Sequence, residues 1–174
     1  MPIRGIDFAT LSLQDALDLA ILIEDEARER YEEFAAQMDQ HRTPVAASFF
    51  RFMAVNEAKH GEALAARRRE RFGDAPRLVS GSALYDVEAP DYDEARAFMT
   101  PRQAMGAALR SEQKARAFFE GALPAVQDAD VRALFQELRE EEVEHEALVK
   151  AELAKLPPGP AFDEEDFVDP PAPQ

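Results

Sequence analysis

Acidic and histidine side chains occupy positions at which the helical apolar pattern of this chain predicts buried residues. They are Glu24, Glu57, His60, Glu112, Glu142 and His145. The apolar residues around each of them recur every three or four positions, as they do along the buried face of an amphipathic helix. His60 and His145 each follow a glutamate by three positions, so each Glu–His pair lies on one helix face. Carboxylates and imidazoles that converge in a protein interior are typical of divalent metal binding.

Four carboxylates in one interior need compensation, because an unpaired buried charge is costly and neighbouring carboxylates raise one another's pKa. Two divalent cations would balance the four negative charges, and two neutral imidazoles would complete the coordination. One Glu from each of two helices, with Glu-x-x-His from each of two others, is the ligand set of di-iron carboxylate bundles. The pattern therefore predicts a two-metal site. Two Fe ions per chain fit it, and Mn or Zn would accept the same ligands.

An internal repeat includes these candidate ligands. When the second half of the chain is laid on the first, Glu112 aligns with Glu24, and the pair Glu142 and His145 aligns with Glu57 and His60. A single Glu-x-x-His is a weak signal in a glutamate-rich chain. The joint placement of the acids in apolar stripes, in register across a duplication, carries the prediction.

These residues fall in four long segments that lack internal proline and are rich in Ala, Leu, Glu, Arg and Gln. We expect helices over roughly residues 13–40, 45–71, 102–123 and 131–156. The first two and the last two are joined by short loops, which favours antiparallel neighbours, whereas residues 72–100 are long enough to run the length of a bundle. The expected fold is all-α: an antiparallel, ferritin-like four-helix bundle with one long crossover between helices two and three.

Local signals support these helix starts and the domain limits. Ser12 followed by Asp15, and Thr100 followed by Pro101 and Gln103, are typical of helix N-termini. We expect residues 1–156 to form one bundle domain, and residues 157–174, which are rich in proline and acidic residues, to form a disordered acidic tail.

Composition excludes several classes of function. The chain has no cysteine, which rules out disulfides, cysteine-ligated iron–sulfur or zinc sites and thiol nucleophiles. Its 35 acidic and 20 basic residues give a net charge of −15, which repels nucleic acid and attracts cations. No apolar run approaches the ~20 residues of a bilayer span, and the N-terminus lacks a signal-peptide core. We therefore expect a cytoplasmic protein that has no membrane span and binds no nucleic acid.

At the candidate ligands the sequence resembles the rubrerythrin and ferritin-like superfamily. The segment IEDEARERY (residues 23–31) looks like the first di-iron helix of rubrerythrins, and NEAKH (56–60) and EVEH (142–145) are similar to their two Glu-x-x-His helices. The resemblance covers roughly residues 10–156. It implies a four-helix bundle in which the six residues named above hold two irons, with Glu57 and Glu142 as bridges between them.

Two departures from the family pattern are visible. Rubrerythrins usually carry a rubredoxin-like domain with a four-cysteine iron site, which a cysteine-free chain does not have. They also tend to place a further Glu three residues after the third-helix ligand, where this chain has Ala115. The six-ligand set is nearer to the pattern of ferroxidases.

The resemblance implies a di-iron oxidoreductase that oxidises Fe(II) with O2 or H2O2, as a ferroxidase or a peroxide scavenger, in iron homeostasis or oxidative-stress defence. An iron-binding or delivery protein without turnover is the alternative, and an inert scaffold whose buried polar cluster only sets helix register is a third. Ile21 and Leu22 add apolar surface outside the first stripe, consistent with a homodimer or higher homo-oligomer. Tyr31 is expected to pack in the core, with a hydrogen bond to a ligand as the alternative.

Overall fold

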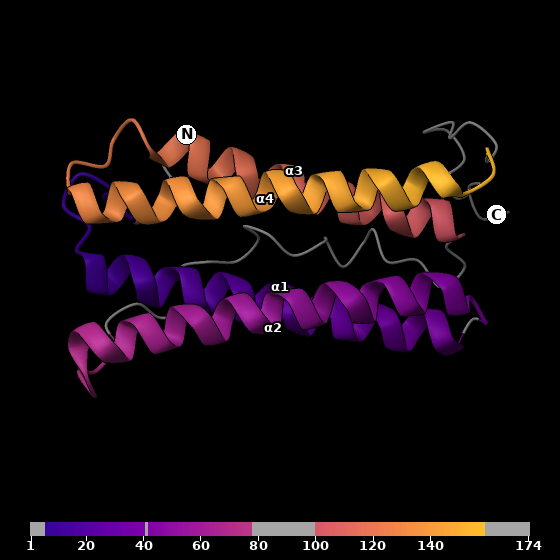
Figure 1. The fold of residues 1–174 in the computed structure, drawn as a ribbon, viewed down its shortest axis with the longest axis horizontal. Helices are drawn as coiled ribbons and strands as arrows, with labels where there is room; N and C mark the ends of the chain where they lie inside the picture. Colours follow the sequence, from indigo (N-terminus) through magenta and orange to yellow (C-terminus); the bar gives the residue numbers. More distant parts are fainter. Residues whose placement is uncertain (1–5, 41, 78–99, 159–174) are drawn as a thin grey trace, which may run out of the picture.

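The structure is a computed structural model that describes residues 6–40, 42–77 and 100–158 (Figure 1). These residues form four α-helices and no strand: α1 (Leu13–Gln40), α2 (Pro44–Phe72), α3 (Pro101–Ala122) and α4 (Ala129–Lys155). The predicted all-α four-helix bundle is confirmed, with helix limits close to those expected from the sequence. The expected tail lies almost wholly outside the described residues.

The helices are arranged as two hairpins that face each other as two layers. α1 pairs with α2 and α3 pairs with α4, each through a short connection (Figure 1). α2 ends and α3 begins at opposite ends of the bundle (Figure 1). The placement of these two helix ends agrees with the long crossover that the sequence predicts, and residues 78–99, on which that prediction falls, lie outside the described part of the chain.

Local side-chain caps fix where three of the helices begin. Thr100 accepts a hydrogen bond from the Gln103 backbone, and the Gln103 side chain accepts one from the Thr100 backbone, which forms a capping box. Ser12 Oγ accepts from the Asp15 backbone at 3.1 Å. Asp128 accepts from two backbone N–H groups in the first turn of α4. These bonds satisfy N–H groups that have no partner inside the helix.

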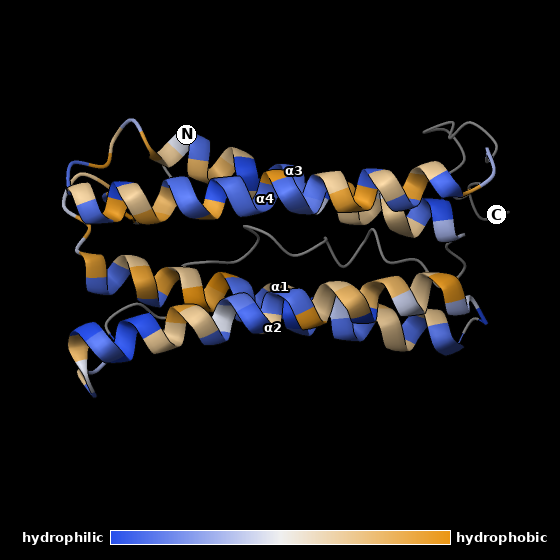
Figure 2. Cartoon of the chain, viewed as in Figure 1, coloured by the Kyte–Doolittle hydropathy of each residue, from blue (hydrophilic) through white to orange (hydrophobic). Residues whose placement is uncertain are grey.

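The bundle has two apolar clusters with a polar zone between them. One cluster joins the first half of α1 to the end of α3 and the start of α4, and it includes Leu17, Phe119 and Phe135. The other joins the end of α1 to the start of α2 and of α3, around Phe34 and Phe50. Colouring by hydropathy shows hydrophilic residues near the middle of α2 and α4 (Figure 2). The polar zone therefore lies between two apolar clusters, which pack the helices together at its two ends.

The apolar surplus of α1 is used inside the chain. Ile21 is buried, and Leu22 packs against the first cluster, so these residues do not form the exposed apolar face that their sequence positions indicated. The large apolar residues that do remain exposed in the described part lie on α2 and α4, among them Phe52 and Leu148. A homo-oligomer stays a prediction. Among the described helices, none combines the length and the apolar character that a membrane crossing requires.

We expect Phe50→Ala to lower the free energy of unfolding by about 3–5 kcal/mol, because it opens a cavity in the second cluster. Phe50 is fully buried, stacks on Tyr31 with ring centroids 5.8 Å apart and meets Phe34 edge-on at 5.3 Å. Phe52→Ala is the matched control, because Phe52 lies on the same helix and is 47% exposed. The decrease in the free energy of unfolding for Phe52→Ala should stay below about 1 kcal/mol. Urea titration of both variants in the presence of a metal chelator measures the difference, and equal decreases in the two variants would contradict this packing.

Candidate metal centre

The structure brings all six predicted residues into the polar zone of the bundle. Each helix contributes side chains from near its middle. α1 and α3 each provide one glutamate, and α2 and α4 each provide one Glu–His pair. Five of the six side chains are almost completely buried, and His60 is partly exposed. The residues brought together in this way are Glu24, Glu57, His60, Glu112, Glu142 and His145.

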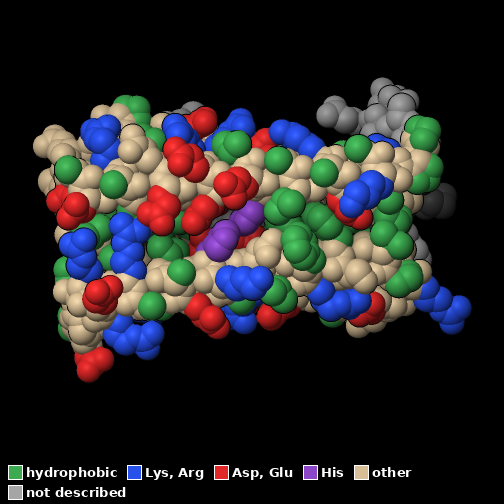
Figure 3. Space-filling view, in the orientation of Figure 1, with side chains coloured by type: hydrophobic (Ala, Val, Ile, Leu, Met, Phe, Trp, Pro, Cys, Tyr) green, Lys and Arg blue, Asp and Glu red, His purple; other side chains and the backbone are tan. Residues whose placement is uncertain are grey.

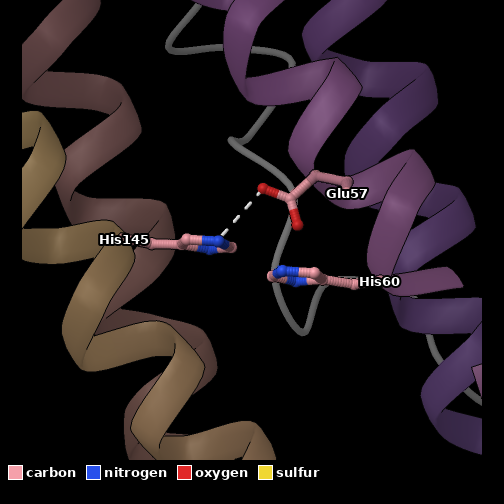
Figure 4. Close-up of side chains that lie close together, drawn as sticks. All are labelled: Glu57, His60 and His145. Atoms are coloured by element: carbon pink, nitrogen blue, oxygen red, sulfur yellow. Dashed lines mark ion pairs between the residues drawn. The ribbon is translucent and has the colours of Figure 1, made fainter. Parts of the chain in front are cut away.

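Around His145 lies a buried group of carboxylates. Its Nδ1 atom is 3.2 Å from Glu112 Oε2, 3.6 Å from Glu57 Oε1 and 3.9 Å from Glu142 Oε2. Figure 4 shows Glu57 reaching from α2 toward His145 on α4. Ligand atoms of Glu112, Glu142 and His145 all lie within 4.8 Å of one another, so they could bind one ion.

A second group of ligand atoms forms around His60. Its Nδ1 atom is 3.9 Å from Glu24 Oε2 and 3.9 Å from Glu141 Oε2, and the three atoms lie within 4.8 Å of one another. Glu141 was not among the predicted residues. It precedes Glu142 at the edge of the apolar stripe of α4, in a glutamate run where acidity alone carries little information. The usable signal was its helical phase, which places it about 100° from Glu142 on the same helix.

The two groups are adjacent. The imidazole rings of His60 and His145 are nearly parallel, with an interplanar angle of 3° and centroids 5.1 Å apart (Figure 4). One ring comes from each hairpin. A further group of ligand atoms, from Glu57, His60 and His145, joins the two. The two hairpins thus meet at a single centre that could hold neighbouring metal ions.

Tyr31 packs in the core and also contacts a candidate ligand. Its ring is fully buried against Phe50, and its hydroxyl donates a buried hydrogen bond to Glu112 Oε1. The other oxygen of Glu112 faces His145. Both alternatives considered for this residue are therefore present together, and the aromatic packing fixes the orientation of a carboxylate.

The buried acids outside the centre have basic partners. Asp18 forms an ion pair with Arg68, which also donates to the Ala75 carbonyl at 2.8 Å. Glu146 is 2.7 Å from Arg116 Nη1 and accepts from Lys150 at 2.6 Å. These pairs compensate the buried charge, as a folded interior requires, and so the two acids are not candidate ligands.

Glu24 and His60 instead present ligand atoms that lack a partner. Glu24 Oε2 and His60 Nδ1 are buried and make no hydrogen bond to the described residues. A buried polar atom left in this way is destabilising unless something binds it. Oxygen and imidazole nitrogen donors without sulfur suit Fe(II), and also Mn or Zn. The donor set and the unpartnered atoms thus fit a divalent metal.

The electrostatics of the centre favour proton uptake when metal is absent. Burial raises the pKa of Glu24 to about 8, against a hydrogen bond with Glu57 that lowers it. Burial also lowers the pKa of His60, with the nearby His145 acting in the same direction. Burial lowers the pKa of His145 too, but the hydrogen bond and negative charge of Glu112 outweigh it, so that pKa is raised overall. Protons thus neutralise part of the acidic cluster.

The chain is similar to known proteins over most of its length. The family model described as rubrerythrin matches residues 15–153. A similar solved structure is the crystal structure at 2.00 Å of an uncharacterized conserved protein from Magnetospirillum magnetotacticum MS-1. The two sequences are 30% identical, the TM-score is 0.68, and the match covers 87% of this chain and 100% of that one. A search of curated proteins found no match.

Without metal, we expect the protein to become less stable as the pH rises from about 6.5 to 8. Glu24 has a folded-state pKa of about 8 against an ordinary value of 4.5, so the folded chain keeps a proton that the unfolded chain has released. A raised folded-state pKa stabilises below the unfolded value, and this stability is lost as the pH rises through the folded one. His145 acts in the same direction. The lowered pKa of His60 opposes this trend only below about 6.5.

Thermal unfolding in chelator across this pH range measures the effect. Glu24→Gln cannot titrate and should flatten the pH dependence, whereas Glu70→Gln, at an exposed position on α2, should leave it unchanged. A melting temperature that rises with pH in the parent would show that the centre does not hold protons in this way.

Proposed function

Because this chain belongs to the rubrerythrin family, we propose that it is a di-iron oxidoreductase that oxidises Fe(II) with O2 or H2O2 in iron homeostasis or oxidative-stress defence. The observation that carries the proposal is the presence of two neighbouring groups of carboxylate and imidazole ligand atoms. One group lies around His60 and the other around His145, and the two imidazole rings are stacked on each other. The cytoplasmic location and the homo-oligomer expected from the sequence remain part of this proposal.

We assign one ion to the group around His60 and the other to the group around His145. Glu24 would hold the first ion, Glu112 would hold the second, and Glu57 and Glu142 would bridge them. The place of Glu57 supports its bridging role: it shares α2 with His60, yet its Oε1 lies 3.6 Å from the ring of His145.

Iron bound here would supply electrons to the oxidant and act as a Lewis acid. The residues of the chain hold the ions and limit the access of water. The apolar clusters exclude solvent from the two ends of the centre, and Tyr31 keeps Glu112 turned toward His145. The net charge of −15 favours the approach of Fe(II) to the molecule. This division of roles requires no catalytic side chain beyond the ligands.

Anaerobic Fe(II) titration of the metal-free protein tests the proposal. O2 or H2O2 is then added in the presence of excess Fe(II). We expect two ions to bind per chain and several further equivalents to be oxidised on addition of O2 or H2O2. Glu57→Ala should lose tight binding and turnover, because Glu57 lies between the two groups. Glu70→Ala, an exposed change on the same helix, should retain both.

The same experiment separates the alternatives. Two bound ions with a single stoichiometric oxidation would favour an iron-binding or delivery protein without turnover. No saturable binding, or binding indifferent to Glu57, would leave only a polar-cored scaffold and would refute the proposed function.

A further inference from the structure

The two halves of the centre are related by the internal repeat but are not equivalent. The repeat places His60 opposite His145 and Glu24 opposite Glu112, so the shared ligands are the same in both copies. Glu141 and Tyr31, which both contact the centre, have different residues at the corresponding positions of the other copy. The counterpart of Glu141 is Asn56, and the counterpart of Tyr31 is Phe119. The half around His60 thus has an additional carboxylate, and the half around His145 has an additional hydrogen-bond donor.

Glu141 adds its carboxylate where the centre is open to solvent. The side chains of His60 and Glu141 are 28% and 32% exposed, whereas the side chain of His145 is only 5% exposed. In the space-filling view, histidine is visible at the surface between the two hairpins, with acidic side chains beside it (Figure 3). An ion can therefore reach the half around His60 from solvent without passing through the apolar clusters.

The ligand atoms on this side already converge without any bridging residue. Nδ1 of His60 lies at 3.9 Å from both Glu24 Oε2 and Glu141 Oε2. The Glu24 and His60 atoms are buried and have no hydrogen-bond partner among the described residues. Two carboxylates and one imidazole are sufficient to hold one divalent ion with water at the remaining positions.

The other half is closed. Glu112 is fully buried and is held by the hydroxyl of Tyr31 on one oxygen and by His145 on the other. Glu142 and His145 are also almost completely buried. An ion bound among these residues would have little contact with water and could leave only if this network opened.

We propose that Glu141 is a seventh metal ligand, which makes the half around His60 the solvent-facing position where a divalent ion binds first and from which it exchanges. The ion held by Glu112, Glu142 and His145 is the retained one. The inference rests on the proposed two-metal centre. It adds an order of filling and a difference in exchange rate between the two ions.

Co(II) is a suitable probe, because its absorbance reports each bound ion and it undergoes no turnover here. Release of two bound ions from the parent to excess EDTA should occur in two phases of similar amplitude, one fast and one slow. Glu141→Gln keeps the shape of the side chain. It should lower the binding affinity for one of the two ions by about tenfold or more, and the fast phase of release should no longer be seen as a separate phase. The slow phase should be unchanged.

Two further variants make the test specific. Glu140→Gln is the matched control, since its side chain is 70% exposed and pairs with Arg139, and it should behave as the parent does. Tyr31→Phe removes the hydrogen bond to Glu112 and should accelerate the slow phase while leaving the fast phase unchanged.

The outcomes distinguish this inference from the proposed function. If Glu141→Gln retains both affinities and both release rates, or weakens both ions equally, Glu141 is not the ligand of an exchangeable position, and the two-metal centre still stands. If the parent binds no Co(II) and no Fe(II), the proposed centre itself fails, and this inference fails with it.

Discussion

Four carboxylates are buried in the middle of the bundle, and the other helices, clusters and hydrogen bonds are arranged around them. A carboxylate removed from water must be compensated by a cation, a proton or hydrogen bonds. The buried acids outside the centre use basic side chains, as Asp18 uses Arg68. Within the centre, burial moves the pKa of Glu24 to about 8, and Glu112 keeps the pKa of His145 raised. Divalent ions would replace these protons. The negative charge that needs compensation in the metal-free centre is therefore also what would attract the metal ions.

The apolar clusters supply the stability that the polar zone does not. They lie on both sides of the centre and hold the two hairpins together, so the ligand positions are set by packing before any ion binds. Tyr31 shows how the two functions are joined. Its ring packs against Phe50 in one cluster, and its hydroxyl fixes Glu112 at the edge of the centre. The aromatic core thus determines the orientation of a candidate metal ligand.

The duplication gives the centre two similar ligand sets, and a few departures from the repeat make them different. Tyr31 corresponds to Phe119 in the other copy, and Glu141 corresponds to Asn56. Tyr31 holds Glu112 in the closed half around His145, and Glu141 adds a carboxylate to the solvent-facing half around His60. If the centre takes up one ion and keeps another, as we propose, it can use such an asymmetry, because one site cannot both exchange an ion quickly and retain it tightly.

The helices and the six central residues can be predicted from the sequence, because both depend on local spacing. A period of three to four residues assigns side chains to one helix face, and caps such as Thr100 with Gln103 involve only neighbours. The contacts of residues at the edge of a stripe cannot be predicted in this way, because they depend on the packing of the helices against one another. Glu141 faces His60, and Ile21 is covered within the chain, only because of where the other helices lie. Position along a helix fixes the direction of a side chain, whereas its partner is fixed by the packing of distant segments.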